Sequence, residues 1–247
     1  MIILKNRQQI ETIKKAGSVV REILDTLKSN IKVGDLTLKL AEISNQIIAK
    51  YPQAKSAFLG YNRYPASICV SINNEIVHGI PSDRKIKNGD LVSVDVGIDW
   101  QGFKADAAET FMIGEVKSKH QLLVQATKEA LKNAIAVAKK GNFIGDISYE
   151  IQKTLEKAGF SPVKECTGHG IGQNLHEDPS VPNFGTPKTD AILKTGMVLA
   201  IEPMAVEKYN AIRIKADNWT IVTEDGGYSA HFEKTIAITD GEPEILT

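Results

Sequence analysis

Two long segments of the chain place apolar residues at spacings of three and four. In residues 8–29 these are Ile10, Ile13, Val20, Ile23, Leu24 and Leu27, and in residues 119–140 they are Leu122, Leu123, Ala126, Ala130, Leu131, Ile135 and Val137. Such spacing gathers apolar side chains on one face of a helix. We therefore predict two amphipathic helices, the second ending at Gly141.

A second helical pattern follows each of these helices after a Gly-Asp pair. The two segments are VGDLTLKLAEI, from Val33, and IGDISYEIQKTL, from Ile144. Asp35 and Asp146 are the predicted N-caps, because a short carboxylate can accept the free amide hydrogens of a first helical turn.

An alternating, valine-rich strand pattern with one acid also occurs twice. KNGDLVSVDVG, residues 87–97, contains Asp95, and KTGMVLAIEP, residues 194–203, contains Glu202. The same order therefore occurs twice: an amphipathic helix, a second helix that follows a Gly-Asp pair, and a strand that carries an acid. We interpret this as an internal duplication within a single domain, residues 1–247, with halves of roughly 1–116 and 117–247 whose acids share one site.

The first acid-bearing strand continues into a predicted hairpin. Asp99 and Gly102 suit the first and fourth positions of a type I turn, which would place Asp95 directly opposite Asp106. Two carboxylates about 5 Å apart on a buried face need a proton or a cation between them. The alternative is a polar stripe in which both acids meet water.

The overall charge and the cysteine count exclude several classes of protein. Thirty basic residues balance thirty acidic ones, so no general field favours nucleic acid or an anionic membrane. Cys69 and Cys166 do not make a disulfide framework, and apolar runs are far shorter than the roughly 20 residues of a membrane helix. With no signal peptide pattern at the start, a cytoplasmic protein without membrane contact is expected.

Further acids and a histidine extend the candidate site. SAHFEKTIAIT carries Glu233, and TGHGIGQNLHEDP, residues 167–179, carries His169 among glycines. A lone histidine is more often structural, so the hypothesis depends on the whole set: Asp95, Asp106, His169, Glu202 and Glu233. Hard oxygen ligands with one imidazole suit two divalent ions, manganese, iron(II) or cobalt, with zinc not excluded. Paired ions of this kind support hydrolysis.

The motifs DVG…D, GHGIG…HEDP, IEPM and FEKT, in this order, resemble those of the bacterial type I methionine aminopeptidases. The resemblance covers essentially the whole chain. It implies the α+β pita-bread fold, two pseudo-symmetric halves with helices packed on a curved antiparallel sheet around a central dimetal site. It also implies removal of the initiator methionine from the N-termini of nascent polypeptides with a small second residue. A monomer is expected, and transient contact with the ribosome is compatible with this activity.

The resemblance implies roles for individual residues. The four acids and His169 named above would bind the two metal ions, with Asp106 and Glu233 bridging, and Glu202 would handle the proton of the attacking water. His78, in VHGIP, would contact the scissile amide, and His176 would stabilise the intermediate. The methionine pocket would comprise Tyr61, Tyr64, Cys69 and Trp219. His231 would support a ligand, and a nucleophilic role for Cys69 is the sharper alternative to pocket lining.

Four positions depart from the family pattern. They are Phe58, where many members have cysteine; Gly97, where many have threonine; Leu175, in place of an aromatic residue; and Lys234, where histidine is common. Related functions also stay open. Prolidases and Xaa-Pro aminopeptidases share the fold but usually carry an extra N-terminal domain, and some relatives are non-catalytic binding proteins that have lost metal ligands. Metal content and hydrolysis of a Met-Ala peptide distinguish these alternatives.

Overall fold

The fold is described by a computed structural model that covers residues 1–208 and 211–247. Its helices are α1 (Arg7–Asn30), α2 (Thr37–Ile48), the short 3-10 helix η1 (Tyr61–Arg63), α3 (Ser118–Val137) and α4 (Ile144–Lys157). The four α-helices occupy the segments that the apolar periodicity predicts.

The two predicted N-caps are wrong. Helix α2 begins after Leu36, and the Asp35 carboxylate instead accepts hydrogen bonds from the Lys32 amide and the Lys39 ammonium. Asp146 lies within the first turn of α4, where it accepts a hydrogen bond from the Phe143 amide at 2.8 Å. Each acid satisfies a backbone N–H near a helix start, but from a position one or more residues away from the cap.

The strands form antiparallel sheets. Their bounds are β1 (Ala54–Ser56), β2 (Cys69–Ile72), β3 (Glu75–Val77), β4 (Leu91–Trp100), β5 (Phe103–Met112), β6 (Ser161–Pro162), β7 (Thr167–Gly170), β8 (Glu177–Pro182), β9 (Val198–Ile201), β10 (Met204–Val206), β11 (Ile212–Ile214), β12 (Ile221–Thr223), β13 (Ser229–His231), β14 (Lys234–Ala237) and β15 (Glu244–Ile245). The sheet orders are β1-β4-β2 with β5 paired to β4, β13-β10-β6, β11-β12-β3 and β15-β14-β9-β7-β8. Helices packed on antiparallel sheets confirm the predicted α+β class.

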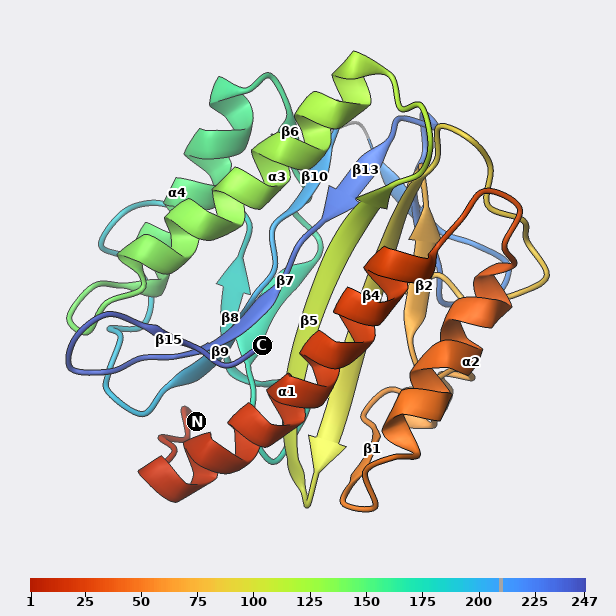
Figure 1. Cartoon of the computed structure of the whole chain (residues 1–247). Helices are drawn as coiled ribbons and strands as arrows, with labels where there is room; N and C mark the ends of the chain where they lie inside the picture. The colour runs from red at the N-terminus through yellow and green to blue at the C-terminus, as the bar shows by residue number, and fades with distance from the viewer. Residues whose placement is uncertain (209–210) are drawn as a thin grey trace.

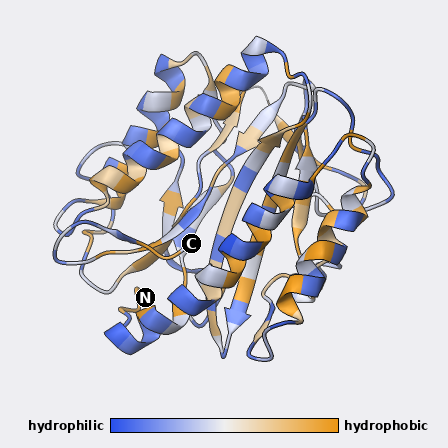
Figure 2. Cartoon of the chain, in the orientation of Figure 1, coloured by the Kyte–Doolittle hydropathy of each residue, from blue (hydrophilic) through white to orange (hydrophobic). Residues whose placement is uncertain are grey.

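The helices cover one side of the strands, and the opposite side is left for the site. Figure 1 shows α1 and α2 in front of the β4–β5 hairpin and its neighbours, with α3 and α4 in front of the strands of the second half. Ile13, Val20 and Leu27 of α1 are fully buried toward the strands, and the outward helix surfaces are largely hydrophilic (Figure 2). No helix in the described ranges has the length and apolarity to cross a membrane.

The β4–β5 hairpin differs from its prediction in turn and register. Trp100 pairs with Phe103, so the loop residues are Gln101 and Gly102, with φ values of 51° and 91°. Two positive φ values belong to a type I′ turn, whose twist matches that of the strands, rather than to the predicted type I turn. Asp95 therefore faces Ala108, and Asp106 faces Gly97. The shift is two residues, so both acids still lie on one face of the hairpin.

Each predicted half contributes a helix pair before its acid-bearing strands: α1 and α2 precede β4, and α3 and α4 precede β9. Domain organisation and duplication stay predictions.

Candidate metal centre and peptide pocket

Asp106 and Glu233, acids from the two predicted halves, are brought together by hydrogen bonds between β5 and the β14 region. The Thr235 hydroxyl accepts from the Asp106 amide at 2.9 Å and donates to the Asp106 carbonyl at 2.8 Å. The Glu233 amide donates to the Ala108 carbonyl at 2.9 Å. These bonds fix Asp106 and Glu233 opposite each other, and Thr235 is a positioning residue that the strand patterns do not reveal.

Glu202 and Glu233 both occupy breaks between strands. Ile201 pairs with Lys234 at the ends of β9 and β14, and Met204 pairs with His231 at the starts of β10 and β13. Glu202 and Glu233 lie in the intervening gaps, which face each other. The interruption of the ladders lets both glutamates turn toward the concave side of the sheets.

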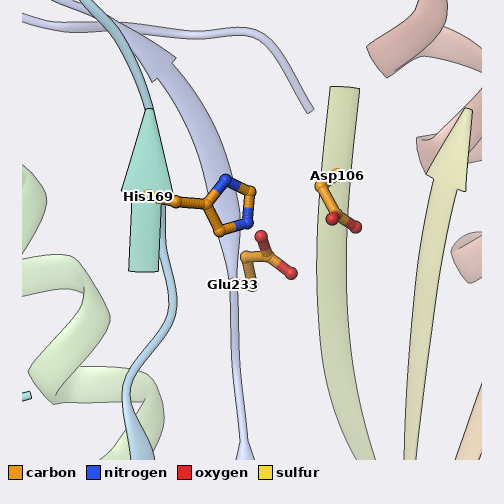
Figure 3. A group of neighbouring side chains, drawn as sticks. All are labelled: Asp106, His169 and Glu233. Atoms are coloured by element: carbon orange, nitrogen blue, oxygen red, sulfur yellow. The ribbon is translucent and has the colours of Figure 1, made fainter. Parts of the chain in front are cut away.

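Donor atoms from β5, β7 and the gap between β13 and β14 converge in a buried cluster. Asp106, His169 and Glu233 offer ligand atoms that lie within 4.8 Å of one another, and Figure 3 shows the three side chains pointing toward a common centre. The Glu202 carboxylate adjoins this cluster, with Oε1 3.5 Å from His169 Nε2. Asp95 lines the same cavity and shares the hairpin face with Asp106. All five predicted ligands therefore meet at one place.

The His169 ring is oriented to offer a lone pair. Its Nδ1 lies 2.9 Å from the Gly170 carbonyl, which can only accept a hydrogen bond, so Nδ1 carries the proton. Burial lowers the pKa of His169 to about 3, so the ring is neutral and Nε2 has a free electron pair. A carbonyl that fixes the tautomer in this way is typical of histidine ligands.

The carboxylates are electrostatically unfavourable without a cation. Burial raises the pKa of Asp95 to about 6 and that of Glu202 to about 8. Burial and the neighbouring carboxylates raise the pKa values of Asp106 and Glu233 well above their ordinary range. Asp95 Oδ1, Asp106 Oδ1 and Glu233 Oε1 are buried and have no hydrogen-bond partner among the described residues. Unpartnered, mutually repelling oxygens beside an imidazole lone pair fit divalent cations.

Three further histidines surround this cluster. The His176 ring lies edge-on to His169, with centroids 4.3 Å apart, and its Nδ1 is 2.7 Å from the Tyr61 hydroxyl. His78 lines the cavity with a positive φ of 60°, an uncommon conformation for a residue other than glycine. His231 is buried, and its Nε2 lies 3.5 Å from Glu202 Oε2.

The predicted methionine-pocket residues line one cavity with these ligands. The cavity has a volume of about 180 Å³ and is lined by Tyr61, Tyr64, Cys69 and Trp219, together with Phe58 and Leu175. The Tyr64 hydroxyl donates to the Gly79 carbonyl at 2.9 Å, and its ring lies edge-on to Trp219. Burial and the nearby Asp95 carboxylate raise the pKa of the Cys69 thiol. A protonated thiol supports pocket lining over the nucleophile alternative.

Two of the four departures are linked in space. A Cβ on Gly97 would lie 2.3 Å from Cε1 of Phe58, so the Phe58 ring occupies the space that a residue-97 side chain would need. Lys234 lies beside Glu233, and burial lowers the pKa of its ammonium group. Nothing in the sequence shows that Phe58 and Gly97 touch, so there they are two separate departures.

Comparison with known proteins places this site and fold together. Residues 11–240 match the family model of the metallopeptidase family M24. The chain is 44% identical to methionine aminopeptidase of Clostridium perfringens, covering 100% of this chain and 99% of that protein, and 43% identical to methionine aminopeptidase 1 of Bacillus subtilis, with the same coverage. A crystal structure of methionine aminopeptidase from Thermotoga maritima superposes with a TM-score of 0.98 at 45% identity, covering 100% of this chain and 99% of that one.

The chain therefore belongs to the metallopeptidase family M24 and, within it, to the methionine aminopeptidases. It is a metalloaminopeptidase, and the family implies divalent metal ions as cofactors. The predicted pita-bread fold is confirmed. A prolidase from Pyrococcus furiosus matches with a TM-score of 0.81 at 23% identity, and this match shows a shared fold alone. The match covers 65% of the prolidase chain.

Proposed function

We propose that the protein removes methionine from the N-termini of nascent polypeptides whose second residue is small, using two divalent ions held by Asp95, Asp106, His169, Glu202 and Glu233. The observation that carries this proposal is the buried set of unpartnered carboxylate oxygens beside the neutral His169 ring. Four negative charges match two divalent cations, which the four carboxylates and the His169 ring would hold between them. Such ions, when bound, would activate a water and polarise the scissile carbonyl.

Glu202 is the group that we assign to proton transfer. Its carboxylate adjoins the ligand cluster, with Oε1 3.5 Å from His169 Nε2. A carboxylate beside the bound ions would take a proton from the attacking water and return it to the leaving amine. His231, whose Nε2 lies 3.5 Å from Glu202, would help to orient it.

His176 and His78 are assigned to the substrate. When the Tyr61 hydroxyl donates to Nδ1 of His176, the proton of that ring is on Nε2. An Nε2–H facing the cavity can donate to the oxygen that gains charge as the amide is attacked. Burial lowers the pKa of His78 to about 4, so it also acts as a neutral hydrogen-bonding group at the scissile amide.

The methionine side chain would lie between Tyr61, Tyr64, Cys69 and Trp219. Aromatic walls and a thiol suit a flexible, polarisable thioether. Phe58 and Leu175 add apolar surface to the same cavity. These residues support preference for methionine at the N-terminal position.

The proposed function is tested by comparing peptide hydrolysis by the metal-loaded and the metal-free protein. Protein purified without added metal is analysed for bound manganese, iron, cobalt and zinc, and then assayed on Met-Ala-Ser and on an Xaa-Pro peptide. We expect hydrolysis of Met-Ala-Ser that is abolished by chelation and restored by the metal that copurifies. Cleavage of Xaa-Pro alone would refute the substrate assignment, and metal-loaded protein inert on both peptides would favour a binding protein.

We further propose that the chain acts in the cytoplasm as a single catalytic domain and a monomer, because donors from both predicted halves complete one site. Transient ribosome contact would bring nascent N-termini to it. Light scattering coupled to size exclusion, with activity measured across the same peak, tests the monomer.

A further inference from the structure

The segment before α1 lies against the loop that carries His176. The Lys5 amide donates to the Gly196 carbonyl at 2.7 Å, which fixes the backbone of the segment. The Lys5 side chain then enters the protein interior, where Nζ forms an ion pair with Glu177 Oε2 and donates to the Ile3 carbonyl at 2.9 Å. Both charged side chains are only 3% exposed. Glu177 is the residue directly after His176.

Glu177 also forms a hydrogen bond within its own loop. Its Oε1 accepts from the Asn174 amide at 3.0 Å, so the two oxygens of one carboxylate bind the loop and the N-terminal segment. The Gly172 carbonyl, at the start of the loop, accepts from the Lys104 amide at 2.8 Å. The loop is thus held at both ends by residues distant in sequence.

Gly172 leaves the space that the ion pair fills. A Cβ on Gly172 would lie 2.4 Å from Lys5 Cε and 2.8 Å from Glu177 Oε1. The lysine stem and the carboxylate therefore pack directly on the backbone of the loop. Loss of the ion pair would therefore remove atoms that pack on the loop backbone four residues before His176.

Two other ion pairs near the ends of the chain have a different character. Met1 pairs with Asp178 through groups that are 99% and 60% exposed, and Lys14 pairs with Glu244 through side chains that are 45% and 37% exposed. Exposed ion pairs contribute little to the stability of a protein. Loss of one partner from a buried pair, in contrast, leaves an uncompensated charge in the interior. The Lys5–Glu177 pair is the one whose loss disturbs the loop.

We propose that Lys5 is a positioning residue for His176: its buried ion pair with Glu177 holds the 172–177 loop so that the His176 ring meets the cavity and the Tyr61 hydroxyl. This inference rests on the proposed function, because it takes His176 to act on the substrate. Lys5 itself does not line the cavity, so it acts only through the loop.

The first test is the Lys5→Met variant, which keeps the stem and removes the charge. We expect kcat on Met-Ala-Ser to fall about tenfold, within the range for residues that orient catalytic groups, with KM and metal affinity unchanged. Lys14→Met, the exposed control, should behave as wild type. In a His176→Ala background Lys5→Met should lower kcat no further, because the two changes disable one function. A full additional loss in that background would overturn the proposal.

A second readout does not depend on catalysis. Hydrogen exchange of the Asn174 amide, which is bonded to Glu177, should become faster in Lys5→Met and stay slow in Lys14→Met. If Lys5→Met does not fold, Lys5→Met/Glu177→Gln removes the orphaned charge and should show the same two effects to a smaller degree. Unchanged exchange together with unchanged kcat in the folded variant would refute positioning. Wild-type protein inactive on methionine peptides would instead refute the proposed function, whatever the exchange shows.

Discussion

Gly97 and Phe58 show how one residue can set the chemistry available at another. The Phe58 ring fills the space beside Gly97 on the face that carries Asp95 and Asp106. A threonine at residue 97, with a hydroxyl near the proposed metal ligands, would therefore require the Phe58 ring to move. The two departures from the family pattern are therefore coupled, because the larger residue at one position fills the space left by the smaller residue at the other.

We predict that Gly97→Thr destabilises the protein by about 1–3 kcal/mol, as overpacking of a core usually does, and that Phe58→Cys relieves part of this cost. The double variant should be more stable than the sum of the single changes by about 1 kcal/mol or more. Urea denaturation of the four proteins measures this coupling. Gly241→Thr, whose Cβ would have 3.9 Å to its nearest neighbour, is the control and should be additive with Phe58→Cys. Additivity for Gly97→Thr would show that the two sites are independent.

Asp106 is a residue whose function opposes stability. Its carboxylate is buried beside Asp95 with Oδ1 unpartnered, which a cation would compensate. We predict that Asp106→Asn weakens metal binding at least about a hundredfold, beyond the usual effect of residues around a ligand, and raises the melting temperature of metal-free protein at pH 8. Calorimetry of metal binding and of unfolding measures the two effects.

Glu109→Gln is the matched control, because Glu109 lies on the other face of the same strand and pairs with Lys28. It should bind metal as wild type does. Normal metal affinity in Asp106→Asn would remove Asp106 from the ligand set.

The β4–β5 hairpin carries two of the proposed metal ligands, Asp95 on β4 and Asp106 on β5, so its turn controls how they lie relative to each other. Gln101 adopts a φ of 51° in the two-residue loop. Asparagine tolerates this region better than glutamine, and Asn-Gly is the favoured type I′ pair. We expect Gln101→Asn to stabilise the protein by about 0.5 kcal/mol, measured by urea denaturation. The same change at the helical residue Gln46 should be neutral or slightly destabilising, and equal effects at both positions would contradict the argument.

Elements were predictable where a single local rule decides their structure. The four α-helices follow from apolar periodicity, because burial against a sheet imposes a period that the sequence displays. The hairpin was predicted, but its turn was placed one residue early, because Asp99 and Gly102 satisfy a type I turn while strand twist selects type I′. The Asp99 carboxylate in fact accepts from the Gly102 amide at 2.7 Å, beside the turn.

The four candidate acids could be found because carboxylates are conspicuous in apolar segments, and His169 because it stands among glycines. Their supports could not, since contacts such as Thr235 with Asp106, Tyr61 with His176 and Lys5 with Glu177 join residues far apart in the chain. No local pattern in a single sequence records which distant residues meet.

The whole molecule acts as a frame that holds like charges together. Hydrogen bonds between β5 and the β14 region join the two predicted halves at the point where their acids meet. The fold therefore carries an electrostatic cost in its centre when no cation is bound. This cost should be visible in the dependence of stability on pH.

Two kinds of buried group, carboxyls and histidines, have shifted pKa values and decide whether stability rises or falls with pH. Buried carboxyls have raised pKa values, about 6 for Asp95 and about 8 for Glu202, so the folded state binds more protons than the unfolded state and stability falls as pH rises above their ordinary values of 3.8 and 4.5. Burial lowers the histidine pKa values, to about 3 for His169 and about 4 for His78, from 6.5. Their contribution to stability is lost as pH falls below 6.5, which opposes the carboxyls there.

About one pH unit above the ordinary histidine pKa of 6.5 the histidines are neutral in both the folded and the unfolded state, and the buried carboxyls dominate the slope. We predict that the melting temperature of metal-free protein falls as pH rises from about 7.5 to about 8.5, the range in which Glu202, with a pKa of about 8, loses its proton. Added manganese should raise the melting temperature more at pH 8 than at pH 6.5, because cations bind the deprotonated carboxylates and stabilise the folded state by mass action.

Scanning calorimetry in chelator and in manganese across this range measures both slopes. Asp106→Asn should flatten the metal-free slope, because it removes one of the carboxyls that burial and charge repulsion hold protonated. A metal-free melting temperature that rises toward pH 8 would mean that the buried acids are compensated by groups of the chain itself. The carboxylates would then have no electrostatic need for a cation, and the two-metal assignment would lose its main physical support.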